Sequence, residues 1–139
     1  MNDYIFLDSG NQKKLEQFGD YILIRPCPQA IWPPAFPNLW VKAHDEFDRE
    51  KENRWKKKAL PPSWVIDFNS IKFKLSPTDF GHIGLFPEHS GQWGFMGQNL
   101  KKPKLKVLNL FAYSGAATLF LAKHGADVCH LDASKGMVK

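Results

Sequence analysis

The sequence has few cysteines and no long apolar run. Its 139 residues include only two cysteines, Cys27 and Cys129, and no apolar stretch approaches the roughly 18 residues that a membrane-spanning helix needs. The cysteines lack metal-ligand spacing, and Cys129 falls in a predicted buried strand, where a small apolar role is expected. No signal peptide precedes residues 2–4. We therefore expect a cytoplasmic protein without a membrane span, and we predict no metal site.

The composition fits a globular protein with a positive charge. Hydrophobic residues make up 43% of the chain, which suffices for one core, and the net charge is +5. Basic residues cluster in two segments, 48–58 and 101–106. One interpretation is phosphate contact with RNA, with Trp55 stacking on a base. The alternative is a solvated surface around loops. RNA is the partner that we predict.

The first half of the chain predicts short strands separated by irregular segments. Residues 4–7 and 21–24 have the composition of strands, and Leu15–Phe18 between them is predicted as a turn or a short helix. Five prolines between Arg25 and Trp40 argue against regular structure there. The polar stretch Val41–Lys58 is predicted to be partly helical.

A β-hairpin is predicted around Asn69-Ser70. A two-residue turn at this dipeptide would pair Phe68 with Ile71, Ile66 with Phe73 and Trp64 with Leu75. All six side chains would then lie on one face of the hairpin, which gives it a buried side. We accordingly predict a small, mainly β domain over residues 1–76. A second domain is predicted to start at residue 77 and to continue to residue 139.

The stretch Val107–Asp132 predicts a strand, a turn, a helix and a second strand. Val107–Ala112 is mostly apolar without alternation, as expected of a strand covered on both faces. Ala116–His124 follows as a helix that Gly125 closes. Val128–Leu131 is the next predicted strand, and Asp132 stands at its carboxyl end. The order is β-α-β, the unit that positions nucleotide-like cofactors.

Gly115 and Asp132 carry the chemistry of this unit. The turn before the helix offers free backbone N–H groups, and a glycine there lets a ligand approach closely. A carboxylate beyond the second strand can accept hydrogen bonds from both hydroxyls of a ribose. A dinucleotide site requires G-x-G-x-x-G, but this turn has one glycine, which disfavours a nicotinamide-dependent oxidoreductase. S-adenosylmethionine has no phosphate and suits a single glycine, whereas a generic βαβ crossover without a ligand stays open.

The sequence also resembles a known family. Leu110–Ala116 together with Asp132–Lys135 is similar to motif I and its acidic partner in class I S-adenosylmethionine-dependent methyltransferases. The branch it resembles contains bacterial 23S rRNA cytosine methyltransferases and their uncharacterised relatives. Leu15–Gly19, Arg25-Pro26 and Phe80–Glu88 are similar to the amino-terminal part of those relatives. The resemblance implies an α/β fold, in which a small, mainly β domain precedes the first βαβ of a Rossmann-like methyltransferase sheet.

The resemblance also implies a set of cofactor-binding residues. Asp132 would bind the ribose hydroxyls. The residues expected around the methionine end are Ala112, Tyr113, Ser114, Gly115 and Ala116, and those near the adenosine are Ala133 and Ser134. Phe86 and Glu88, with His89 beside them, are expected to line the cofactor from another loop. Ala116 stands where many members have a second glycine, a difference of one methyl group.

The chain is shorter than such an enzyme. The methyltransferase fold needs about seven strands, and the D-P-P-type catalytic motif after the fourth strand is absent. We therefore expect an amino-terminal part of a longer enzyme, inactive by itself, which transfers methyl groups to rRNA or another nucleic acid. No catalytic residue is assigned. A non-catalytic RNA-binding module is the alternative. The open edge of a two-stranded sheet could be hidden by a partner chain, so a homo-oligomer is possible.

Overall fold

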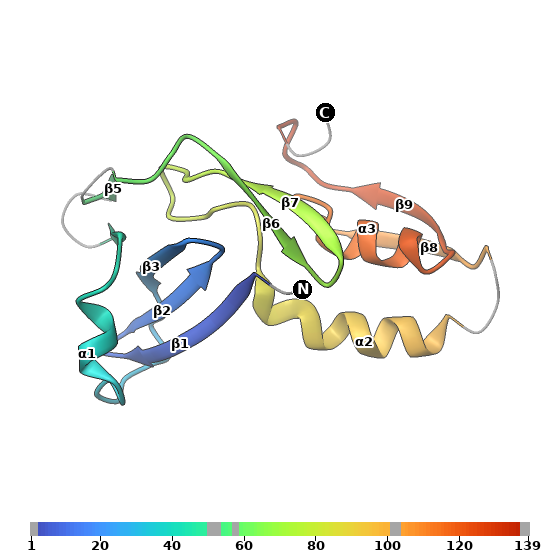
Figure 1. The fold of residues 1–139 in the computed structure, drawn as a ribbon. Coiled ribbons are helices and arrows are strands. Elements are labelled where there is room, and N and C mark those ends of the chain that lie inside the picture. The colour runs from blue at the N-terminus through green and yellow to red at the C-terminus, as the bar shows by residue number, and fades with distance from the viewer. Residues whose placement is uncertain (1–2, 50–53, 57–58, 101–103, 137–139) are drawn as a thin grey trace. The chain divides into compact units, whose positions relative to one another are not determined.

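The chain forms two compact units. The computed structural model describes residues 3–49, 54–56, 59–100 and 104–136. The amino-terminal unit spans residues 1–84 and the carboxy-terminal unit spans residues 85–139. Strands dominate the first unit, whereas the second combines helices with two strands (Figure 1). No helix within these described ranges is long and apolar enough to span a membrane.

A five-stranded sheet forms most of the amino-terminal unit. Its strands, in spatial order, are β1 (Tyr4–Gly10), β2 (Lys13–Phe18), β3 (Tyr21–Pro26), β4 (Asp45–Asp48) and β5 (Arg54–Trp55). Only β3 and β4 pair in parallel. The two strands predicted from residues 4–7 and 21–24 are confirmed. The turn or helix predicted for Leu15–Phe18 is wrong, because Asn11 and Gln12 turn the chain with φ of +50° and +62° into a tight hairpin.

A buried charged cluster explains why β2 is hard to recognise in the sequence. Glu16 is fully buried, although it is a charged residue and interrupts the apolar pattern of the strand. Its carboxylate accepts a hydrogen bond from Arg25 Nε at 2.8 Å and another from the Tyr4 hydroxyl at 3.1 Å. Lys14 Nζ lies 3.1 Å from the same carboxylate. A buried carboxylate is tolerated only with such partners, and they come from three strands.

The proline-rich segment is organised by one carboxylate. Asp8 is buried and accepts hydrogen bonds from the backbone N–H of Phe36 at 2.9 Å and from Trp40 Nε1 at 2.8 Å. The short helix α1 (Pro37–Trp40) lies here with a proline in its first turn. The prediction that residues 25–40 lack regular structure is therefore wrong for these four residues, and also for Arg25 and Pro26, which end β3. The helix predicted within residues 41–58 is also wrong, since β4 and β5 occupy the described part.

The hairpin predicted around Asn69-Ser70 is confirmed. β6 (Trp64–Phe68) and β7 (Ile71–Leu75) pair with the predicted register. Asn69 and Ser70 have φ of +53° and +58°, as a tight two-residue hairpin turn requires. The side chains of Ile66, Phe68, Phe73 and Leu75 are at least 95% buried.

The carboxy-terminal unit places two helices around a parallel strand pair. Its elements are the 3₁₀ helix η1 (Pro87–His89), α2 (Ser90–Asn99), β8 (Lys106–Leu110), α3 (Ala116–Lys123) and β9 (Asp127–Leu131). β8 and β9 pair in parallel, with α3 between them in the chain. α2 packs on α3 through Trp93 and Phe120, whose ring centres are 5.7 Å apart. η1 leads directly into α2, so the chain is helical from Pro87 to Asn99.

One face of the β8–β9 pair is exposed. Leu108 is 59% exposed and Leu131 is 55% exposed, whereas alternate residues of both strands are half-buried. The prediction of a strand covered on both faces is therefore wrong for the described residues. The prediction of a buried Cys129 is wrong for the same reason, since its side chain lies on the exposed face.

Candidate functional site

A strained bend connects β8 to α3. Phe111, Tyr113 and Gly115 have φ of +55°, +49° and +84°, so every second residue of the bend is left-handed. Two of these are not glycine, and such a backbone persists only where its surroundings hold it. Backbone hydrogen bonds supply part of that support, because Ala112 N donates to Leu131 O at 3.1 Å and Gly115 N donates to Ala112 O at 2.9 Å.

Asp132 ties the end of β9 to this bend. Its Oδ2 accepts a hydrogen bond from the backbone N–H of Tyr113 at 2.8 Å, and its Oδ1 accepts one from Ser134 N at 2.8 Å. These two hydrogen bonds lower the pKa of the Asp132 carboxyl, and the nearby imidazole of His130 adds to the effect. The predicted acid thus lies beside the predicted turn, as an ionised group with acceptor capacity left on both oxygens.

Gly115 begins α3 and lies directly on the ring of His130. A Cβ at Gly115 would come within 3.3 Å of His130 Cε1, which leaves no room for a side chain without movement. His130 Nδ1 is 3.0 Å from Thr118 Oγ1, and Thr118 Oγ1 accepts a hydrogen bond from Asn109 Nδ2 at 2.9 Å. The chain of polar contacts joins β8, α3 and β9 below the bend.

A cavity of about 340 Å³ lies between the bend and the η1–α2 segment. The predicted site residues that line it are Phe86, Ala112, Tyr113, Ser114 and Ala116. The ring centres of Phe86 and Tyr113 are 5.0 Å apart, so the two segments are in contact here. Glu88, Gly115, Asp132, Ala133 and Ser134 lie outside the lining. Glu88, Ala133 and Ser134 are exposed, and the last two follow Asp132 at the end of β9.

Sequence reasoning missed several residues of this cavity. Gln92, Trp93 and Met96 line it from α2, where they follow His89, a residue that was predicted and that lines the cavity from the end of η1. The spacing of these residues, three to four apart, is the signal that puts them on one helix face. Phe111 also lines the cavity, with a side chain that is 90% exposed. A large exposed aromatic next to a cavity is a candidate ligand contact.

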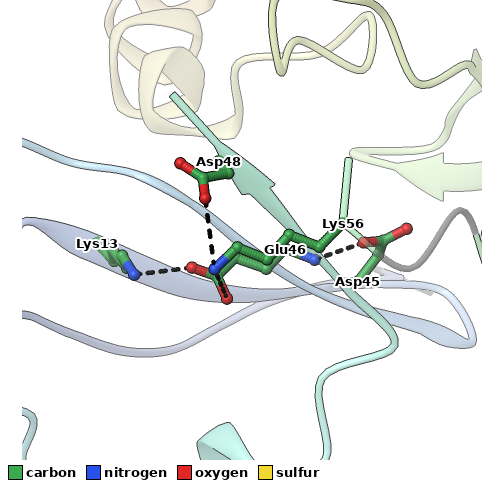
Figure 2. Close-up of polar contacts among 5 residues, drawn as sticks. All are labelled: Lys13, Asp45, Glu46, Asp48 and Lys56. Atoms are coloured by element: carbon green, nitrogen blue, oxygen red, sulfur yellow. Dashed lines mark hydrogen bonds and ion pairs between the residues drawn. The ribbon is translucent and has the colours of Figure 1, made fainter. Parts of the chain in front are cut away.

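A second, more polar cavity of about 290 Å³ lies in the amino-terminal unit. Figure 2 shows Lys13 and Lys56 next to Glu46. Their Nζ atoms lie 2.7 and 3.0 Å from its carboxylate oxygens, and Asp48 Oδ2 lies 3.7 Å from Lys56 Nζ. Burial raises the pKa of Glu46, but the hydrogen bonds from both lysines outweigh it and leave that pKa lowered. The hydrogen bond to Glu46 raises the pKa of Lys56. Lys56 is therefore held as a cation.

The structure describes only part of the two basic clusters that are predicted to contact RNA. Lys56 and Arg54 are described, whereas residues 50–53, 57–58 and 101–103 lie outside the described residues. The side chain of Trp55 is 9% exposed and packs against Phe47, with ring centres 5.4 Å apart. It offers little surface for stacking on a base, so that prediction is wrong. Within the described part of the chain, no group of three or more His, Cys, Asp or Glu side chains could hold a metal ion.

Comparison with known proteins connects this geometry to one class of enzyme. No family model and no curated protein matches the sequence. Among solved structures, the chain is similar to the SAM-dependent methyltransferase from Agrobacterium tumefaciens, with a TM-score of 0.86 and 40% identity over 99% of this chain and 46% of that chain. It is also similar to a Streptococcus mutans protein assigned as a SAM-dependent methyltransferase and to an assigned methyltransferase complexed with SAH.

The last two structures support the fold alone. Each has a TM-score of 0.72 and 18% identity, and the match covers 98% of this chain and 40% of theirs. The chain thus spans less than half the length of the methyltransferases that it matches. Its described residues have the fold of the corresponding part of those enzymes.

Proposed function

We propose that this chain forms the cofactor-binding part of an S-adenosylmethionine-dependent methyltransferase. In this proposal β8, α3 and β9 are the first βαβ unit of a Rossmann-like sheet, and residues 77–139 begin the cofactor domain that follows a small β domain of residues 1–76. The observation that carries the proposal is the carboxylate of Asp132, which lies 2.8 Å from the bend at Tyr113. The 40% identity with a SAM-dependent methyltransferase supports it.

The bend and the Asp132 carboxylate would bind different parts of the cofactor. Asp132 uses one hydrogen bond on each oxygen, and a carboxylate has about four acceptor positions, so it can accept two ribose hydroxyls as well. Ala133 and Ser134 lie next to it, where the adenosine would bind. The methionine end would lie in the cavity, against Ala112, Tyr113, Ser114 and Ala116, with Phe86 on the opposite wall. Gly115 and Glu88, which lie outside that lining, are further proposed contacts of the cofactor.

The chain's own part in the reaction is alignment. S-adenosylmethionine supplies an activated methyl group on a sulfonium, so the protein needs to hold it in line with an acceptor and exclude water. The bend fixes the cofactor with backbone groups that are already immobilised, which reduces the entropy lost on binding. Because the chain spans 46% of its relative, we propose methyl transfer for the polypeptide that contains the remaining part as well.

RNA is the partner that we propose for the amino-terminal unit. Lys13, Arg49 and Lys56 line its polar cavity together with two carboxylates, so cations are in excess there. Lysines held by Glu46 lose less conformational entropy when they contact a phosphate. The same observation favours a second candidate, a non-catalytic RNA-binding module. A cytoplasmic location is part of both candidates, and a second copy of the chain could cover the exposed face of β8 and β9.

Calorimetric titrations with three ligands test the proposal. S-adenosylhomocysteine, NADH and a single-stranded RNA are each titrated into the chain. We expect binding of S-adenosylhomocysteine and no response to NADH. Binding of NADH without a response to S-adenosylhomocysteine would eliminate the methyltransferase. RNA binding alone would favour the non-catalytic module. Lys13→Ala should then reduce the salt dependence of RNA binding by about one phosphate contact, with Lys74→Ala, an exposed lysine of β7 outside both basic clusters, as the control.

A further inference from the structure

His130 forms the floor of the bend. The Cβ that Gly115 lacks would lie 3.3 Å from His130 Cε1 and 3.4 Å from Nδ1, so the edge of the imidazole stands directly below this residue. The ring is fixed through Nδ1, which lies 3.0 Å from Thr118 Oγ1. Thr118 is in turn held by the amide of Asn109 at 2.9 Å. One residue from each of β8, α3 and β9 therefore determines where the ring lies.

Packing does not account for a histidine at this position. Thr118 Oγ1 accepts a hydrogen bond from Asn109 Nδ2 and makes a second hydrogen bond with His130 Nδ1 at 3.0 Å. Nε2 is buried and has no hydrogen-bond partner among the described residues. An unpaired buried polar atom costs free energy, so a phenyl ring would fill this space at lower cost. What the imidazole adds is the hydrogen bond between Nδ1 and Thr118.

We propose that His130 is a positioning residue for the cofactor bend. Its Nδ1, held by Thr118, fixes the ring, and the ring sets the depth at which Gly115 lies. Asp132 follows two residues later and holds Tyr113 by its backbone N–H. The end of β9 thus supports the bend at two points. This inference rests on the proposed function, because the backbone groups that are positioned are those proposed to hold the methionine end.

Four variants of the full chain test the role of Nδ1 in binding S-adenosylhomocysteine. His130→Phe keeps a ring and removes Nδ1, and Thr118→Val removes the hydrogen-bond partner of Nδ1. Each should weaken binding roughly two- to tenfold, as the loss of one hydrogen bond does. The double variant should bind no more weakly than either single variant, because both remove the same contact. His130→Asn, whose amide oxygen can replace Nδ1, should restore most of the affinity.

Cys129→Ser serves as the matched control. It changes the neighbouring residue of β9 on the exposed face, and it should leave the affinity unchanged. Wild-type affinity in both His130→Phe and Thr118→Val would overturn the inference. Equal losses in His130→Asn and His130→Phe would also overturn it, because a merely structural ring would not be rescued by an amide.

Hydrogen exchange separates this inference from the proposed function. If the wild-type chain does not bind S-adenosylhomocysteine, the proposed function fails, but the positioning of the bend is still measurable. Amide exchange at Tyr113 and Gly115, whose N–H groups are hydrogen-bonded, should be faster in His130→Phe than in Cys129→Ser. Unchanged exchange at both amides would overturn the inference whether or not a ligand binds.

Discussion

Alanine substitutions at Gly115 and Gly125 separate backbone strain from contact with His130. Both glycines have left-handed backbones, with φ of +84° and +89°. An L-residue pays about 1–2 kcal/mol for that conformation, so Gly125→Ala, whose Cβ meets nothing within 4 Å, should lose about this much stability. Gly115→Ala adds a contact of 3.3 Å to His130. Slight overpacking of this kind costs about 1 kcal/mol more, which gives a total of about 2–3 kcal/mol.

Urea unfolding followed by the amide NMR signals of β8 and β9 measures both losses. The extra loss in Gly115→Ala should disappear in a His130→Ala background, because the ring that the new methyl meets is then gone. Gly125→Ala should cost the same in both backgrounds. Equal destabilisation by the two substitutions, or an extra loss that persists without the ring, would refute the assignment of His130 as the floor of the bend.

Three further predictions concern other parts of the chain. Burial raises the pKa of Asp8, but its hydrogen bonds, above all the one from Trp40, outweigh this effect and leave that pKa lowered. Asp8 therefore stabilises the fold at a pH above its pKa in the unfolded state. This contribution is lost as the pH falls through its pKa in the folded state. Asp8→Ala should cost about 1–3 kcal/mol at pH 7 in urea unfolding and flatten the acid dependence, and an unchanged acid limb would contradict this. Asp132→Ala should weaken S-adenosylhomocysteine binding on the order of tenfold by calorimetry, whereas Asp127→Ala at the opposite end of β9 should not; equal affinities would remove Asp132 from the site. Gly91→Ala in α2 has open space around its Cβ and should raise stability by about 0.5–1 kcal/mol in urea unfolding; a loss would show that the glycine is needed.

Elements defined by local signals could be predicted from the sequence. The β6–β7 hairpin follows from apolar alternation around Asn69-Ser70, and its register agrees with the prediction. The end of α3 follows from Gly125, whose N–H donates to Ala122 O at 3.0 Å while Ala126 N donates to Leu121 O at 3.1 Å. In both cases the information lies within a few neighbouring residues.

Elements that depend on distant partners could not be predicted. β2 was missed because Glu16 interrupts its apolar pattern, and its burial becomes tolerable through Lys14 and through Arg25 and Tyr4 from neighbouring strands. β4 was missed because it begins with Asp45, a fully buried carboxylate that accepts hydrogen bonds from Glu46 N and Ala59 N. From a single sequence, a charged residue is predicted to lie on the surface, so a strand that buries one is not recognised.

The candidate site shows the same difference between residues with local sequence signals and residues that depend on distant partners. The residues of the bend and Asp132 follow a contiguous motif, and the structure brings Asp132 and Tyr113 into contact. The α2 side of the cavity, including Trp93, comes from a helix whose apolar face is weak, since glycines occupy several of its positions. The role of His130 depends on the ring's distance from Gly115, which no spacing in the sequence reveals.

An NMR titration with S-adenosylhomocysteine tests the central claim most directly. Amide signals of the isotopically labelled chain are followed as the ligand is added. If the bend after β8 and the carboxylate after β9 form the cofactor site, the signals of Tyr113, Ser114, Gly115 and Ser134 should shift together, with a common dissociation constant. Shifts confined to residues of the amino-terminal unit, or no shifts at saturating ligand, would contradict the account.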